Sequence, residues 1–91
     1  MPLIFDYSEK LRAIIAILQK KDSRRLEILY KKIKQIINSD EFSIEHYKNL
    51  RHGMKELKRV HVNGSFVLTF RYYKEKIFIL FVDFDHHDKI Y

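Results

Sequence analysis

Apolar residues in the first half of the chain recur three or four positions apart, which predicts two amphipathic helices. The first helix should begin after Ser8, a good N-cap residue, and its apolar positions are Leu11, Ile14, Ile15 and Leu18. The second should be capped by Asp22 or Ser23, and its apolar positions are Leu26, Leu29, Tyr30, Ile33, Ile36 and Ile37. Because the connection is short, we expect an antiparallel helical hairpin.

The second half of the chain changes to β-branched and aromatic runs, which predict strands at 57–62, 66–73 and 76–84. Asn63-Gly64 is a strong type I′ hairpin signal, and Lys74-Glu75 is a weaker turn. Segment 3–5 is a candidate edge strand, and 41–53 looks irregular, with a helical turn near 44–50. The expected fold is α+β in the order β-α-α-β-β-β, a twisted antiparallel sheet with the N-terminal helical hairpin packed on one face.

Composition places these elements in one small domain, residues 1–91. The chain has no cysteine, which excludes disulfides and thiolate metal sites. No apolar run approaches the roughly 20 residues that span a bilayer, and the N-terminus lacks the features of a signal peptide. We therefore expect a soluble cytoplasmic protein that does not associate with membranes.

Charge suggests the kind of partner. The formal net charge is +6, with a pI of about 9.6, and this favours polyanions such as RNA, although solubility alone is the simpler reading. Cations and histidines concentrate in segment 48–61, where they can line a groove for a phosphate backbone. Lysines on an edge strand also serve to prevent pairing with other chains. The candidate RNA-contacting residues are Arg51, Lys55, Arg59, Arg71 and His86.

Three histidines are candidate acid–base groups: His61 before the Asn63-Gly64 turn, and His86 and His87 after the last strand. RNA is cleaved without metal when the ribose 2′-hydroxyl attacks phosphorus while one group removes its proton and another protonates the leaving oxygen. A nearby cation stabilises the added charge. A single histidine is more often structural than catalytic, so the catalytic interpretation depends on the three histidines together.

The same C-terminal segment is a poor metal site. His86 and His87 lie between Asp85 and Asp88, but neighbours on a strand point to opposite faces and would not easily chelate one ion. We expect neither a metal nor another cofactor. Tyr91, the last residue, is suited to stacking on a base or to filling the core.

The hairpin register creates a difficulty for His61. An ideal two-residue turn at Asn63-Gly64 would pair Val62 with Ser65, which places His61 on the side of Phe66 and Leu68 and Lys58 on the other. A bulge would be needed to redirect His61.

The element order and several short motifs resemble the RelE/ParE toxin superfamily, and within it the YafQ-like and RelE-like mRNA interferases. The motifs are Leu50-Arg51-His52-Gly53, Leu57-Lys58-Arg59-Val60-His61-Val62, Phe66-Val67-Leu68-Thr69-Phe70 and the ending His87-Asp88-Lys89-Ile90-Tyr91. The architecture resembles the superfamily throughout the chain, whereas the specific motifs fall within about residues 50–91.

The resemblance implies the toxin of a type II toxin–antitoxin module that enters the ribosomal A site and cuts mRNA. Its implied partner is a RelB/DinJ-like antitoxin encoded in the same operon, which forms a hetero-oligomer with the toxin. Motif matching assigns proton transfer to His61 and His87, and phosphate binding to Lys58 with Arg59 as a second candidate. Tyr91 falls where the family has a terminal aromatic residue of the active site.

Some positions depart from the family pattern. YafQ-like toxins have an aspartate where this chain has Ser65, and an arginine of RelE-like members falls at Val67. RelE-like arginines near the end are replaced by Asp85, His86 and His87, so the implied site is of a histidine type. Two alternatives stay open: a ParE-like gyrase-inhibiting toxin that acts through its helical hairpin, and a non-catalytic basic module that binds RNA or protein.

Overall fold

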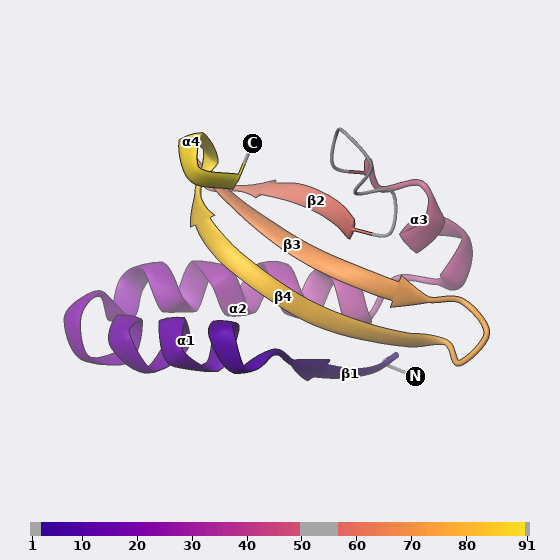
Figure 1. Ribbon diagram of the computed structural model, residues 1–91, viewed down its shortest axis with the longest axis horizontal. Helices are drawn as coiled ribbons and strands as arrows, with labels where there is room; N and C mark the ends of the chain where they lie inside the picture. The colour runs from indigo at the N-terminus through magenta and orange to yellow at the C-terminus, as the bar shows by residue number, and fades with distance from the viewer. Residues whose placement is uncertain (1–2, 50–56, 91) are drawn as a thin grey trace.

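The computed structural model describes residues 3–49 and 57–90 (Figure 1). Within these ranges the chain forms β1 (Ile4–Tyr7), α1 (Glu9–Lys21), α2 (Ser23–Ile37), α3 (Glu41–Glu45), β2 (Leu57–Val62), β3 (Phe66–Tyr73), β4 (Phe78–His86) and α4 (His87–Ile90). The predicted fold class is confirmed, and the predicted strands and helices follow one another in the expected β-α-α-β-β-β order apart from two short helices. The two short helices are additional: α3 begins before the expected helical turn, and α4 directly follows the last strand. No helix in the described ranges is long and apolar enough to cross a membrane.

The helical hairpin forms as its caps predict. The Ser8 side chain accepts a hydrogen bond from the backbone N–H of Leu11, and Lys20 and Lys21 lie in the last turn of α1, where cations interact well with the helix dipole. Asp22 ends α1 and also caps α2, where its side chain accepts from the backbone N–H of Arg25 at 3.1 Å. One residue therefore serves both helices, which makes the hairpin tight.

The sheet has the strand order β1-β4-β3-β2. Strands β2, β3 and β4 are antiparallel neighbours, as predicted. The prediction of a wholly antiparallel sheet is wrong for β1, which pairs parallel to β4 and makes the sheet mixed. A parallel pair requires a crossover connection. The helical hairpin provides it, and a four-residue edge strand carries no sequence signal that fixes its direction.

The core lies between the helices and one face of the sheet, as Figure 1 shows. The spacing of apolar residues in α2 buries one face of the helix, which comprises Leu26, Leu29, Ile33 and Ile36. These side chains belong to the same cluster as Val62, Leu68, Phe70, Ile79, Phe81 and Phe84 of the strands. The predicted packing of the helical hairpin on one side of the sheet is confirmed.

A bulge in β4 keeps the apolar side chains on both sides of it facing the core. Thr69 pairs with Asp83 but Phe70 pairs with Phe81, so Val82 is the extra residue. The carbonyl of Val82 accepts a hydrogen bond from the Ser8 hydroxyl at 2.6 Å, which ties the start of α1 to the bulge. Phe81 and Phe84 both face the helices as a result.

The β3–β4 turn is longer than predicted, since β4 begins at Phe78 rather than near position 76. Ile77 closes the turn with φ +50°, an unusual conformation for a β-branched residue.

Candidate active site

The loop between β2 and β3 determines which way His61 points. Asn63 and Gly64 have φ +51° and +80°, as the turn signal predicts, but Val62 pairs with Phe66 rather than with Ser65. The loop therefore contains three residues, and this shift by one position exchanges the faces of β2. Val62 enters the core, whereas His61 pairs with Val67 and is exposed. We call the sheet face away from the helices the open face.

His87 reaches the same face from the other end of the sequence. Its backbone N–H donates to the carbonyl of Ser65 at 2.7 Å, which fixes the start of α4 to the hairpin loop. Figure 1 shows α4 at the end of the sheet beside β2 and β3. The ring centroids of His61 and His87 are 6.0 Å apart, with 33° between the ring planes. Two histidines that are 26 positions apart in sequence thus lie side by side.

Asp88 supports His87. One carboxylate oxygen lies 3.2 Å from Nδ1 of His87, so the ring can donate to it in the tautomer with the proton on Nδ1. In that tautomer Nε2 carries the lone pair that can take up a proton. The sequence indicates Asp88 only as a candidate metal ligand, and its adjacency to His87 is the signal that points to this contact.

Arginines are the cations that share the open face with His61. Arg59 precedes His61 by two residues and pairs with Thr69, and Arg71 pairs with Leu57. They are therefore diagonal neighbours on adjacent strands, a relation in which long side chains interact. Both are partly buried, which reduces the screening of their charge by water. The contact of Arg59 and Arg71 with phosphate stays a prediction.

Lys58 lies on the other side of the sheet. It pairs with the buried Phe70, and its Nζ donates to the carbonyls of Glu45 at 3.1 Å and Tyr47 at 3.2 Å and to Asn49 Oδ1 at 3.2 Å. Burial lowers the pKa of Lys58, and the charge of Glu45 opposes this shift. The structure does not bring Lys58 to His61, because residues three apart on a regular strand point to opposite faces.

His86 is also separated from the histidine pair. It pairs with Phe66, packs edge-on against that ring at 5.4 Å between centroids, and lies 3.7 Å through Nδ1 from Asp88. Arg25 of α2 lies over the same Phe66 ring, 4.3 Å from its centroid. His86 therefore belongs to the helix side of the sheet end rather than to the open face.

Acidic residues occupy the open face on β4. Asp83 pairs with Thr69 and Asp85 with Val67, in the same rows as Arg59 and His61. Asp83 is bonded to Lys10 at 2.8 Å, and this bond raises the pKa of Lys10. The ion pair with Lys10 offsets the charge of Asp83, so the arginines on β2 and β3 are the part of this face that attracts phosphate.

The remaining candidates, Arg51, Lys55 and Tyr91, lie outside the described residues, as does the Leu50-Arg51-His52-Gly53 motif. Among the residues that are described, no group of three or more His, Asp or Glu side chains is arranged to hold a metal ion.

Comparison with known proteins identifies the family. No family model matches the sequence. A protein of Methanocaldococcus jannaschii provisionally named toxin RelE4 is 44% identical over 78 residues, which cover 86% of this chain and 79% of the relative. The chain therefore belongs to the RelE family of toxins.

Solved structures share its fold. The RelBE2 toxin–antitoxin complex of Mycobacterium tuberculosis matches with a TM-score of 0.73 at 16% identity, over 96% of this chain and 93% of that one. YafQ of Escherichia coli strain BL21(DE3) matches with a TM-score of 0.65 at 19% identity, over 96% of each chain. The predicted resemblance to the RelE and YafQ toxins is confirmed.

Proposed function

We propose that this protein is the toxin of a type II toxin–antitoxin module and that it cleaves mRNA in the ribosomal A site by metal-independent acid–base catalysis. The observation that carries the proposal is the pair of His61 and His87 on the open face, 6.0 Å apart between ring centroids. Two histidines at this separation are suited to act on opposite sides of one phosphodiester.

In the proposed reaction, the ribose 2′-oxygen attacks phosphorus as His87 accepts its proton, and Asp88 stabilises the resulting imidazolium. The bond between phosphorus and the 5′-oxygen breaks as His61 donates a proton to that oxygen. The products are a 2′,3′-cyclic phosphate and a 5′-hydroxyl. Arg59 and Arg71 stabilise the extra negative charge on the phosphate in the transition state.

Two features support the proposed partners. The net charge of +6 favours approach to ribosomal RNA and to mRNA. A structure with the same fold, RelBE2, is a toxin–antitoxin complex. We therefore propose that a RelB-like antitoxin, encoded beside this protein, binds it and blocks the open face.

The test of the enzymatic proposal is induced expression in bacteria of the wild type, His61→Ala and His87→Ala, with mapping of mRNA 5′ ends. His46→Gln is the matched control, because His46 is an exposed histidine that follows directly after α3, and α3 lies well apart from α4 in Figure 1. New ends within translated messages are expected for the wild type and the control, and should be absent for both site variants. Growth arrest without new mRNA ends would refute the proposal and favour gyrase inhibition.

The test of the partner proposal is co-expression with each small neighbouring reading frame. The cognate antitoxin should co-purify and, at about 100 times its Kd, stabilise the toxin by about 2.7 kcal/mol. That corresponds to a rise in Tm of about 10 °C or more for a domain of this size. No shift in Tm with any neighbouring product would count against the partnership.

A further inference from the structure

An aromatic pair, of which the Tyr73 ring is exposed and the Phe78 ring is partly buried, lies at the other end of the open face from the histidines. Tyr73, at the end of β3, pairs with Phe78, at the start of β4, and their ring centroids are 5.9 Å apart with 33° between planes. Tyr73 is 39% exposed, although it ends a strand whose central residues are buried. Nothing in the proposed cleavage chemistry uses this pair. An exposed aromatic ring such as that of Tyr73 is the kind of surface on which bases of single-stranded nucleic acids stack.

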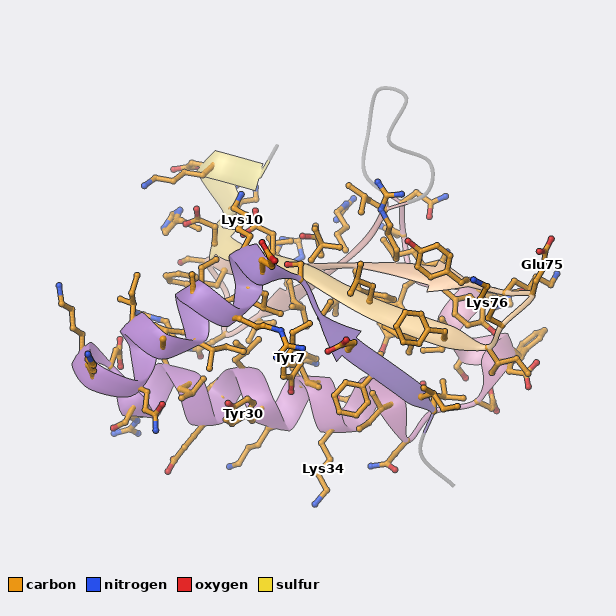
Figure 2. All side chains as sticks on the ribbon, turned by 60° about the horizontal axis from the view of Figure 1, so that its bottom comes forward. Tyr7, Lys10, Tyr30, Lys34, Glu75 and Lys76 are labelled. Carbon is orange, nitrogen blue, oxygen red and sulfur yellow. The ribbon has the colours of Figure 1, made fainter. Side chains whose placement is uncertain are left out.

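Cations surround Tyr73. A hollow of about 430 Å³ at this end of the sheet is lined by Tyr73 and by cations and a carboxylate of both faces: Lys58, Arg71, Lys74, Glu75 and Lys76, together with Asn49 and Tyr72. This volume lies in the range of small-molecule binding sites. Lys74 is paired with Glu45 at 3.0 Å, whereas Lys76 is an exposed lysine at the end of the same turn. Figure 2 shows Lys76 at the tip of the β3–β4 turn.

The histidine pair and the aromatic pair are joined by one continuous strand. On β3, Val67 pairs with His61, and Tyr73 lies six residues further along the strand. Arg71 lies between them on the same face. At about 3.3 Å per residue the two pairs are roughly 20 Å apart. Asp85 lies in the β4 row beside Val67 and disfavours phosphate there, whereas the charge of Asp83 is offset by its ion pair with Lys10.

We propose that Tyr73, with Phe78 behind it, is a base-stacking subsite for single-stranded RNA, a few nucleotides from the bond that is cut. The RNA backbone runs along β3 past Arg59 and Arg71, and one unpaired base stacks on the Tyr73 ring. The inference rests on the proposed function, since it extends the same substrate along the same face. The charges around Tyr73 favour RNA over an acidic protein segment because cations adjoin an exposed ring that suits a base.

The test is the affinity of the protein for a short single-stranded RNA with methylated 2′-hydroxyls, which cannot be cut. Tyr73→Ala should weaken binding about 5- to 150-fold, the range that corresponds to loss of one stacked base. Tyr73→Phe should bind like the wild type, because the ring is kept. Tyr30→Ala is the matched control: Tyr30 is 42% exposed but lies on α2, away from Lys76 in Figure 2. With 2-aminopurine moved along the RNA, one position should be quenched by the wild type and by Tyr73→Phe, but not by Tyr73→Ala.

Several outcomes would overturn the inference: no RNA binding by the wild type, binding by Tyr73→Ala within twofold of the wild type, or an equal loss in Tyr30→Ala. Loss of antitoxin binding by Tyr73→Ala, with RNA binding retained, would assign the patch to the protein partner instead. The two proposals fail separately. A wild type that binds RNA and stacks a base but never cleaves mRNA refutes only the nuclease. A wild type that cleaves, with Tyr73→Ala unchanged in binding, refutes only the subsite.

Discussion

Replacement of Lys58 by methionine should weaken the fold and leave the chemistry of the folded protein largely intact. Methionine keeps most of the apolar stem of lysine and removes its three donors. The carbonyls of Glu45 and Tyr47 and the side chain of Asn49 would then lose their shared partner. These acceptors belong to the segment from α3 to Asn49, so the change should loosen this segment, which stays bonded to β2 through the Arg59 N–H and the Lys48 carbonyl.

The magnitude follows from the contacts. Distances of 3.1–3.2 Å are at the long end for N–H···O hydrogen bonds. A hydrogen bond to a charged group contributes about 1.5–3 kcal/mol, but the three share one ammonium group and are not additive. Burial lowers the pKa of Lys58, which shows that desolvation offsets part of this gain. We expect a net loss of about 1–3 kcal/mol in the free energy of unfolding, or a fall in Tm of about 5–20 °C.

Thermal unfolding followed by circular dichroism measures this loss, with Lys48→Met as the matched control because Lys48 is an exposed lysine of the same segment. The pH dependence gives a second signature. Since the folded-state pKa of Lys58 is below its ordinary 10.5, the unfolded chain binds more protons between those two values. The stability of the wild type relative to Lys58→Met should therefore rise with pH through that window. Unchanged Tm together with lost mRNA cleavage would refute the structural role and make Lys58 part of the active site.

Three further predictions concern local structure. Asp40 caps α3 by accepting from the Ser43 N–H, and this bond lowers the pKa of Asp40 below its ordinary 3.8. The stabilisation by the Asp40 carboxylate should be present above pH 3.8 and lost as pH falls through the folded-state pKa. Between about pH 6 and about pH 3, the Tm of the wild type should therefore fall by more than the Tm of Asp40→Ser. Gly64→Ala should lower the free energy of unfolding by about 1 kcal/mol and the Tm by about 4–8 °C, because Gly64 has φ +80°. The added methyl group itself would meet no atom within 4 Å. A loss of stability as large as that from a core cavity would contradict this turn geometry. Ser65→Ala should keep mRNA cleavage within about twofold, since Ser65 holds His87 through its backbone carbonyl; a large loss would show that the hydroxyl takes part.

The parts of the fold that sequence predicted are those with a local signal. Ser8 and Asp22 cap the two helices where the apolar spacing places them, and the β-branched runs became β2, β3 and β4. The direction of β1 has no such signal, because its pairing with β4 depends on the crossover through both helices. The bulge at Val82 is equally nonlocal, since the Ser8 hydroxyl bonds to the Val82 carbonyl from 74 residues away.

In the candidate site, the orientation of His61 is the feature that the local sequence does not determine. Residue types alone selected His61 and His87, but the face on which His61 lies depends on whether the β2–β3 loop holds two residues or three. The observed loop turns His61 toward His87 and turns Lys58 away, so Arg59 and Arg71 take the place of lysine beside the histidines. Arginine keeps its proton throughout the working range of pH, and it can bind two phosphate oxygens at once. In the proposed reaction these tasks would therefore be separate: the two arginines would bind the phosphate, and both proton transfers would fall to His61 and His87.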